Sequence, residues 1–250
     1  MIMMDLFADI VEPILPFSFP NDSSCYAKWD QKLNGFAISV PNGELFYSQN
    51  FFGQTKSDIY LKSFLENNSN IDLLKQWDKK ANSDLNEINF KNIKWKQDFI
   101  NFYGKKIPLP RLTSWYGDPG KSYSYSGINS NPNPWNTELM KIKETIDVIA
   151  QTQFNSVLLN CYRDGEDYLS WHADDEKELG RNPIIGSVNF GAERDFCLKQ
   201  NDGPIKLTLP LCHGTLLIMK GELQHFWQHS VPKRKKVKDV RINLTYRVIN

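Results

Sequence analysis

The sequence has no run of apolar residues long enough to cross a bilayer, and its start carries no basic segment of the kind that opens a secretory signal. The opening stretch, MIMMDLFADIVEP, is acidic instead. These absences predict a soluble protein with no membrane partner. We expect it in the cytoplasm, or in the nucleus if the source is eukaryotic.

Cysteine is scarce and scattered along the chain. The four residues Cys25, Cys161, Cys197 and Cys212 form no Cys-x-x-Cys pair. Such spacing argues against a thiolate zinc site and against a framework of disulfides, and it suits a reducing compartment. It therefore agrees with a cytoplasmic location.

Net charge is also nearly absent, since 30 basic residues balance 29 acidic ones to give +1. The overall field therefore does not favour a polyanionic partner, and any contact with nucleic acid must come from a local patch. One basic run offers such a patch, although a run of this kind is equally typical of a solvated face. It consists of Lys233, Arg234, Lys235, Lys236 and Lys238.

A chain of 250 residues with 40% hydrophobic composition can bury one substantial core. Residues 1 to about 40 show little periodicity, and Pro13, Pro16 and Pro20 interrupt any regular element there. We expect an irregular N-terminal extension followed by one domain. The sequence shows no internal repeat and no assembly signal, so we expect a monomer.

Helical spacing appears in two places. Apolar residues recur at this spacing between Ile59 and Trp77, interrupted by the polar run NNSN, which predicts two short helices. A second pattern follows Asn136 and Thr137, which are suitable cap residues. Its apolar stripe of Leu139, Ile142, Ile146 and Ile149 predicts a helix packed on a sheet.

After Phe154 the sequence changes to short β-branched and aromatic runs separated by turn residues. These runs are FNSVLLNCY, PIIGSVNFG, RDFCLK, IKLTLPL, GTLLIM and VRINLTYRVI. Between two of them, the sequence 200–203, Gln-Asn-Asp-Gly, is typical of a hairpin turn. Successive short strands without intervening helices predict a mainly β protein with flanking helices, built as a sandwich or jelly roll.

His172 and Asp174 stand two residues apart in the sequence Trp-His-Ala-Asp, and in an extended chain such residues project to the same face. Two histidines and one carboxylate on one face are the ligand set of many iron(II) oxygenases. A second histidine would have to come from His213, His225 or His229, and spacing alone does not choose among them. A His-x-Asp sequence by itself is a weak signal that also fits a surface turn.

The C-terminal run RINLTYRV alternates strictly between polar and apolar residues. Its polar face carries Arg241, Asn243, Thr245 and Arg247. This face could simply be solvated, but inside a barrel its two guanidiniums would suit a dicarboxylate, because the planar fork pairs with carboxylate oxygens. Asn160 and Tyr162, also two residues apart, could add hydrogen bonds or could be a polar pair at a strand end.

Several of these motifs, in this order, resemble the AlkB-type Fe(II)- and 2-oxoglutarate-dependent dioxygenases. They are PRLTSWYGD, YSYSG, NCYRDGEDYLSWHADDEKELG, PIIGSVNFGAERDFCLK, HGTLLIMKGELQHFWQHSVP and RINLTYR. Spaced motifs in a fixed order are far more specific than any one of them. The resemblance runs from about Gly43 to the C-terminus, so it implies a double-stranded β-helix domain over residues 43–250 and leaves 1–42 as the extension.

The resemblance also implies roles for individual residues. It selects His229 as the third iron ligand beside His172 and Asp174, although GELQHFWQH matches the family context only loosely and a slip to His225 is the alternative. The cosubstrate 2-oxoglutarate would be held by a further set, and O2 is the other reactant. That set is Asn160, Tyr162, Arg241, Asn243, Thr245 and Arg247.

Family members couple decarboxylation of 2-oxoglutarate, which yields succinate, to hydroxylation of an N-methyl group that then leaves as formaldehyde. The motifs are closest to those of duplex-acting DNA repair members, so the expected partner is alkylated DNA carrying lesions such as 1-methyladenine or 3-methylcytosine. Methylated RNA, a protein or a small molecule are alternative substrates. A nucleic-acid-binding module without catalysis is the non-enzymatic alternative, which the complete ligand set disfavours.

An enzyme that acts on a base must take it out of the stack and hold it between aromatic or apolar groups. The resemblance assigns this task to Tyr123 and Tyr125, and it places Asp175 and Glu176 beside the base. Without the resemblance, these would be read as a half-buried strand and a solvated turn. Tyr103, in the sequence NFYGK, is the candidate wedge that enters a duplex. The basic run beside His229 is placed to meet phosphates.

Overall fold

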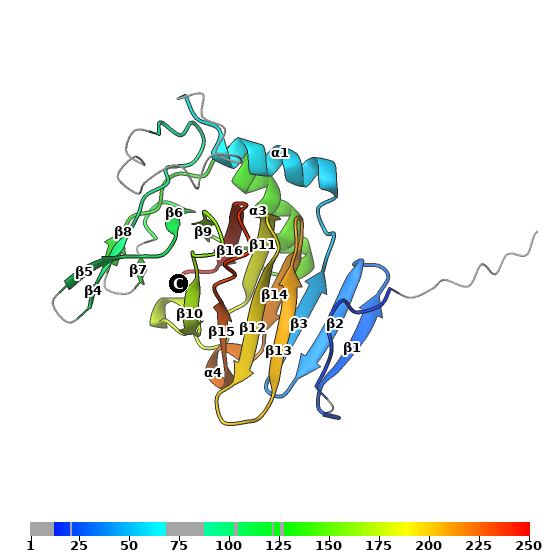
Figure 1. The fold of residues 1–250 in the computed structure, drawn as a ribbon. Coiled ribbons are helices and arrows are strands. Elements are labelled where there is room, and N and C mark those ends of the chain that lie inside the picture. The colour runs from blue at the N-terminus through cyan, green and yellow to red at the C-terminus, as the bar shows by residue number, and fades with distance from the viewer. Residues whose placement is uncertain (1–12, 21, 69–87, 103–104, 122, 126–127) are drawn as a thin grey trace, which may run out of the picture.

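Two β-sheets form the centre of the molecule, with two long helices on the outer side of the larger sheet (Figure 1). The computed structural model describes residues 13–20, 22–68, 88–102, 105–121, 123–125 and 128–250. The major sheet has eight strands in the order β1-β2-β3-β14-β11-β16-β9-β6, and the minor sheet has four in the order β10-β15-β12-β13. This arrangement confirms the predicted fold class, mainly β with flanking helices around a jelly-roll core.

The major sheet is built from segments that lie far apart in the sequence. Its strands, in chain order, are β1 (Tyr26–Asp30), β2 (Gly35–Val40), β3 (Gly43–Ser48), β6 (Leu112–Gly117), β9 (Ser156–Tyr162), β11 (Ile185–Gly191), β14 (Leu216–Lys220) and β16 (Arg241–Arg247). Every pairing in this sheet is antiparallel. The C-terminal strand β16 therefore lies in the middle of the sheet, between β11 and β9.

The minor sheet and two small hairpins complete the strands. The minor sheet contains β10 (Leu169–His172), β12 (Arg194–Gln200), β13 (Lys206–Leu211) and β15 (Trp227–Val231). The hairpins are β4 (Phe99–Phe102) with β5 (Lys105–Pro108), and β7 (Tyr123–Tyr125) with β8 (Ile128–Ser130). Figure 1 shows both hairpins projecting from the same side of the molecule.

The two long helices, which span residues 54–65 and 137–150, cover one face of the major sheet because each has one apolar side. The helical elements are α1 (Gln54–Leu65), α3 (Thr137–Ala150), the short α4 (Leu223–Phe226) and a 3-10 turn, η3 (Lys177–Leu179). In α3, Leu139, Ile142 and Ile146 are fully buried against the sheet. Asn136 caps this helix by accepting a hydrogen bond from the backbone N–H of Leu139 at 2.9 Å, as predicted. No helix among these elements is long and apolar enough to cross a membrane, within the part of the chain that the structure describes.

The structure confirms the strands predicted after Phe154 and the hairpin at 200–203, which joins β12 to β13. It corrects the expectation that residues 1–42 are irregular, since β1 and β2 form a hairpin that extends the major sheet. The left-handed turn at Asn34 (φ 52°) joins these two strands, and the prolines lie before them. The division into domains at residue 43 stays a prediction. The second helix expected before Trp77 lies outside the described residues.

The register of the major sheet aligns polar side chains across its central strands. Asn243 of β16 lies opposite Asn189 of β11 on one side and opposite Asn160 of β9 on the other. The row continues to Thr113 of β6. All four residues are buried. Side chains alternate between the two faces along each strand, so the residues before and after these four point toward the helices. The polar row therefore faces the space between the two sheets.

Gly191 ends β11 where this strand meets Arg241, the first residue of β16. Its backbone has φ +90°, and a Cβ there would lie 2.2 Å from the carbonyl oxygen of Val240. We expect Gly191→Ala to lower the free energy of unfolding by at least about 2 kcal/mol, because strain and a backbone clash combine. Gly53→Ala, with nothing within 4 Å and negative φ, is the matched control and should cost less than about 1 kcal/mol. Urea unfolding measures both; equal effects would show that the close approach at Gly191 carries no cost.

Candidate functional site

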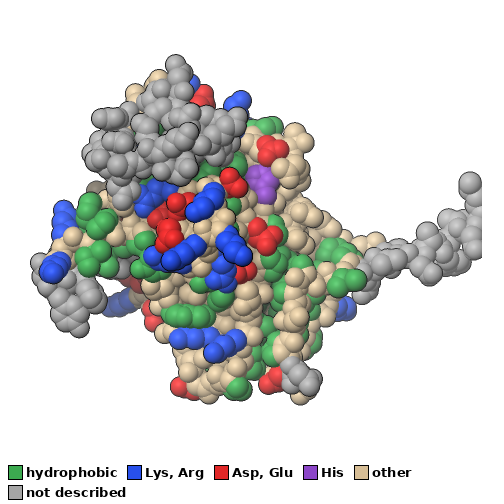
Figure 2. Space-filling view, in the orientation of Figure 1, with side chains coloured by type: hydrophobic (Ala, Val, Ile, Leu, Met, Phe, Trp, Pro, Cys, Tyr) green, Lys and Arg blue, Asp and Glu red, His purple; other side chains and the backbone are tan. Residues whose placement is uncertain are grey.

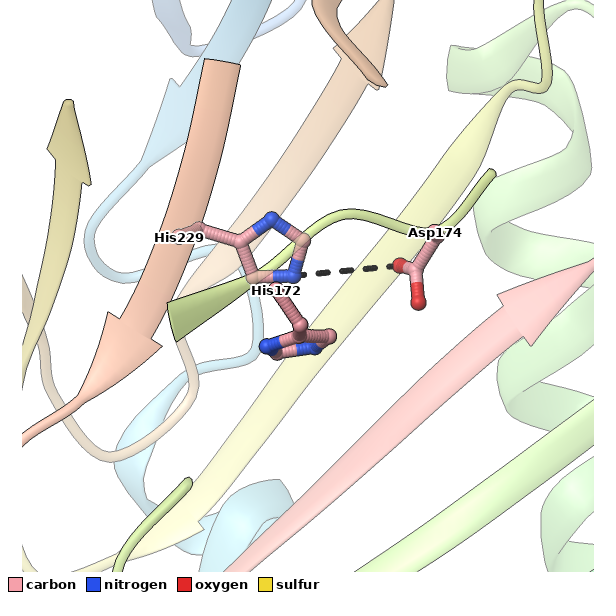
Figure 3. Close-up of side chains that lie close together, drawn as sticks. All are labelled: His172, Asp174 and His229. Carbon is pink, nitrogen blue, oxygen red and sulfur yellow. Dashed lines mark ion pairs between the residues drawn. The ribbon is translucent and has the colours of Figure 1, made fainter. Parts of the chain in front are cut away.

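Three candidate metal ligands converge between the two sheets, as Figure 3 shows. His172 ends β10, Asp174 follows it, and His229 lies on the neighbouring strand β15, directly opposite His172 in the register. One ligand atom from each residue lies within 4.8 Å of the others. The pairing of β10 with β15 therefore brings together two histidines that are 57 positions apart in the sequence (229 − 172).

A buried ion pair holds Asp174 in its ionised form. Asp174 is 1% exposed, and its Oδ1 accepts a hydrogen bond from Nη2 of Arg247 at 2.6 Å. Burial alone would favour the neutral acid, but the Arg247 guanidinium and, to a smaller extent, His229 and His172 lower the pKa of Asp174 to about 2. The backbone N–H of Asp174 donates to Oε1 of the buried Gln224 at 2.9 Å, which fixes the chain at this point.

The two histidines are held in orientations that leave ring nitrogens available. Nδ1 of His172 lies 2.9 Å from the carbonyl oxygen of Ser170, so it donates its proton there and Nε2 keeps a lone pair. His229 stacks on Phe196, with ring centroids 5.1 Å apart, and its Nε2 lies 3.9 Å from Oδ2 of Asp174. Burial, with a further contribution from His172, lowers the pKa of His229 to about 3, so this imidazole is neutral at pH 7.

The same pocket contains the polar face of β16. Its lining includes the three candidate ligands together with Asn160 and Tyr162 of β9 and residues of β16. The β16 residues are Arg241, Asn243, Thr245 and Arg247, as the sequence predicted, so this face is not solvated. The arginines of the lining outnumber its carboxylates by three to one, because Arg111 also lies there and Asp174 is the one acid. Such an excess of buried positive charge suits an anionic ligand.

The guanidinium of Arg241 has N–H groups available to bind an anion. It is 1% exposed; its Nη2 donates to Oδ1 of Asn189, and its guanidinium carbon lies 4.9 Å from the ring centre of Tyr162. Its Nε and Nη1 are buried and have no hydrogen-bond partner among the described residues. Burial lowers the pKa of Arg241 to about 10, so the group is still charged at pH 7. These two groups lie on different edges of the guanidinium, so each can donate to an oxygen of an anionic ligand.

Asn243 and Thr245 already use the hydrogen-bonding groups that the sequence suggested for a ligand. The hydroxyl of Thr245 donates to Oδ1 of Asn243 at 2.9 Å. Nδ2 of Asn243 donates to Oγ of Ser187 at 2.8 Å and lies 3.2 Å from Oδ1 of Asn189. These two residues therefore brace the floor of the pocket through contacts with β11.

Three residues that shape the site received no role in the sequence analysis. Asn189 accepts from Arg241, Gln224 fixes Asp174, and Arg111 donates to Asn160. Period-two alternation along the predicted strand PIIGSVNFG would have placed Asn189 on the pocket side with Ser187. Gln224 lies in α4 and Arg111 precedes β6, and neither position follows from periodicity.

The other two histidine candidates lie outside the cluster. Nε2 of His213 lies 3.1 Å from Oδ1 of Asp58 on α1, and its Nδ1 accepts from the backbone N–H of Gly191. Nε2 of His225 lies 3.1 Å from Oδ1 of Asn182. The geometry therefore brings His229 to the other two ligands and leaves both alternatives bound to other groups.

The predicted base-contacting residues are only partly described. Tyr123 and Tyr125 lie at the two ends of β7, and Tyr103 falls outside the described residues. Asp175 is exposed, as a solvated turn would be. Glu176 is half-buried, and its Oε2 is buried without a hydrogen-bond partner among the described residues. An uncompensated carboxylate oxygen two residues after Asp174 is consistent with a polar contact to a ligand.

The basic run forms an exposed loop after β15. Two of its residues are paired, Lys233 with Glu166 at 3.3 Å and Arg234 with Asp195, whereas Lys235 and Lys236 are exposed and have no ion pair among the described residues. Figure 2, drawn from the side of the minor sheet, shows basic side chains mixed with acidic ones on this face.

The backbone of this loop is tied to the segment that leads into β10. The N–H of Gly165 donates to the carbonyl of Val237 at 2.9 Å, and the N–H of Arg234 donates to the carbonyl of Gly165 at 2.7 Å. The two segments are so close that a Cβ on residue 165 would lie 1.7 Å from the carbonyl oxygen of Arg234. Only glycine fits at this position.

Comparison with known proteins agrees with this arrangement. A family model described as "2OG-Fe(II) oxygenase superfamily" matches residues 58–247. The human "Alpha-ketoglutarate-dependent dioxygenase alkB homolog 3" is 44% identical over 168 residues, which cover 63% of this chain and 58% of that protein. The human "DNA oxidative demethylase ALKBH2" is 40% identical over 158 residues, covering 60% of each chain.

A plant relative extends the same pattern. "DNA oxidative demethylase ALKBH2" of Arabidopsis thaliana is 38% identical over 187 residues, covering 64% of this chain and 59% of that protein. The chain thus spans less than two thirds of the length of the relatives it matches. A solved structure, "The structure of OsALKBH1", aligns with a TM-score of 0.49 and 16% identity over 82% of this chain and 96% of that chain.

The cluster predicts selective loss of metal binding. His172→Ala should weaken binding of Mn(II) or Co(II) at least tenfold, because one of three ligands is removed from a half-exposed position. The matched control is His225→Ala, which removes a histidine outside the cluster and should bind metal normally. Equilibrium dialysis measures metal affinity in both variants. Weakened metal binding in His225→Ala with normal binding in His172→Ala would show that the metal site includes His225 and not His172. Asp174→Ala is a less clean test, because it leaves Arg247 buried without its acid.

Burial of His229 predicts a pH dependence of stability in the metal-free protein. The pKa of His229 is about 3 in the folded state against an ordinary value of 6.5, so between these values the unfolded chain binds a proton that the folded chain excludes. The free energy of unfolding should therefore fall as pH decreases below about 6.5, by up to about 1 kcal/mol per pH unit. Urea unfolding measures this slope. His229→Gln should flatten it, and an unchanged slope would assign the effect to another group.

Proposed function

Because the chain belongs to the 2OG-Fe(II) oxygenase superfamily, we propose that it is a dioxygenase that removes N-methyl groups from alkylated bases in DNA, with 2-oxoglutarate as cosubstrate. Two kinds of relatives support this activity, one named as an alpha-ketoglutarate-dependent dioxygenase and the other as a DNA oxidative demethylase. The reaction class is oxidative demethylation, and its biological setting is DNA repair.

The observation that carries the proposal is the pairing of a metal-ligand cluster with an unsatisfied buried guanidinium in one pocket. His172, Asp174 and His229 would hold Fe(II), because two imidazoles and one carboxylate form the facial ligand set of such oxygenases. When bound, Fe(II) supplies the oxidising chemistry, with O2 and 2-oxoglutarate as reactants.

Arg241 would donate to a carboxylate oxygen of 2-oxoglutarate through Nε or Nη1, the two nitrogens that lack partners among the described residues. The ring of Tyr162 packs against this guanidinium and limits its freedom. Asn160 lies opposite Asn243 in the polar row, lines the same pocket and offers its amide to the same ligand. Asn243 and Thr245 would act indirectly, since their mutual hydrogen bond stiffens the strand between the two arginines.

Arg247 has two tasks in this arrangement. It keeps Asp174 ionised, which a metal ligand requires, and it adds a second positive group to the pocket. Gln224 holds the backbone of Asp174, so the carboxylate is oriented before any metal binds. Orientation fixed in advance lowers the entropy lost on binding.

The nucleic-acid contacts are part of the same proposal. Tyr123 and Tyr125 would flank the flipped base, Asp175 and Glu176 would contact its polar edge, and Tyr103 would enter the duplex. The exposed Lys235 and Lys236 would meet phosphates beside the pocket. We further propose that the protein acts as a monomer in the cytoplasm, or in the nucleus of a eukaryotic source.

The proposal is tested by supplying Fe(II) and 2-oxoglutarate without oxygen, then admitting oxygen in the presence of oligonucleotides that carry 1-methyladenine or 3-methylcytosine. Loss of one methyl group per succinate formed is the expected result, and mass spectrometry measures both products. Arg241→Met should lower turnover at least 100-fold, because the carboxylate loses its buried partner.

The substrate form separates the possible outcomes. Faster turnover of duplex DNA than of RNA with the same lesion would support the DNA assignment, and the reverse would reassign the enzyme to RNA. Succinate without demethylation of either would keep the dioxygenase and reject these bases. Absence of succinate in all reactions, with metal bound, would reject the enzymatic proposal.

A further inference from the structure

Arg111 is a third buried arginine of the pocket, and although it lies in the motif PRLTSWYGD, no role has been assigned to it above. It immediately precedes β6, the edge strand of the major sheet, and it is 3% exposed. It lines the pocket together with Arg241 and Arg247. A buried guanidinium requires an explanation, because its desolvation is costly unless its hydrogen bonds are used.

The hydrogen bond from Arg111 determines how the amide of Asn160 is oriented. Nε of Arg111 donates to Oδ1 of Asn160 at 2.8 Å, and both residues are buried. An arginine Nε–H can only donate, so its partner must be the amide oxygen and not the amide nitrogen. The ambiguity between oxygen and nitrogen that attends most asparagine side chains is thereby removed.

The other half of the amide is therefore a donor. Nδ2 of Asn160 has no acceptor among the described residues, and Asn160 lines the pocket beside Asn243 of the next strand. If the amide were turned by 180°, the pocket would receive a carbonyl oxygen instead. A carboxylate ligand accepts hydrogen bonds from an NH2 group and is repelled by an oxygen.

We propose that Arg111 is a positioning residue for 2-oxoglutarate: it fixes Asn160 with its amino group directed at a carboxylate of the cosubstrate. The inference rests on the proposed function and adds a residue to it. Arg111 acts through Asn160, the partner of its Nε–H, whereas Nε of Arg241 has no partner among the described residues.

The first test measures binding of 2-oxoglutarate to the Mn(II)-loaded protein by calorimetry, without turnover. Arg111→Met keeps the apolar stem and removes the donor. We expect its Kd to rise about tenfold, the effect of one hydrogen bond that is no longer oriented. Arg181→Met, which removes an exposed arginine outside the pocket, is the matched control and should bind as the unsubstituted protein does.

A double-variant cycle tests whether Arg111 acts through Asn160. Asn160→Ala should weaken binding by itself, and adding Arg111→Met to it should change Kd less than twofold, because nothing remains to be oriented. Effects that multiply would show that Arg111 contacts the ligand independently and would overturn the proposal. Binding by Arg111→Met with unchanged affinity would overturn it as well.

Arg111→Lys separates orientation from charge and serves if Arg111→Met unfolds. Lysine retains the positive charge but has a methylene where arginine has Nε, so it should bind 2-oxoglutarate about as weakly as the methionine variant. Restored affinity in Arg111→Lys would assign the effect to charge and overturn the proposal. Failure of the unsubstituted Mn(II)-loaded protein to bind 2-oxoglutarate would instead reject the proposed function itself.

Discussion

The buried ion pair between Asp174 and Arg247 connects the two halves of the site. Arg247 ends the central strand β16 of the major sheet, whereas Asp174 follows β10 of the minor sheet. Neither group is stable alone in this position, since burial disfavours an unpaired charge. Their 2.6 Å contact therefore requires both sheets to be in place, and it brings the metal-ligand cluster next to the arginines of β16. The rest of the site is arranged around this contact.

The surrounding residues restrict the groups that a ligand would meet. Gln224 holds the backbone of Asp174, Asn189 holds Arg241, and Arg111 holds Asn160. In each case a buried side chain uses a hydrogen bond to orient a group that faces the pocket. Such contacts are formed during folding, so little rearrangement is needed when a ligand binds. The fold thus supplies a positively charged cavity whose one carboxylate is that of Asp174, the proposed metal ligand.

The sequence predicted those parts of the site that lie on regular strands. Alternation along RINLTYR placed Arg241 and Arg247 on one face, and the structure confirms that this face lines the pocket. The second histidine could not be chosen by spacing, because its choice depends on the pairing of β10 with β15. Arg111 and Gln224 could not be found either, since their partners are 49 and 50 residues away and lie on other elements. β1 and β2 were missed because a proline-rich stretch precedes them and each strand is short.

The tie between Gly165 and the loop that carries the basic run consists of backbone groups alone. Lys233 and Arg234 add ion pairs to these backbone bonds, whereas Lys235 and Lys236 have none among the described residues, so exchanging these two lysines leaves the bonds intact. The positive charge at these two exposed positions can therefore change without a change in the position of His172. Substitution there would alter the surface charge of the loop, whereas a side chain at position 165 would clash with the carbonyl oxygen of Arg234.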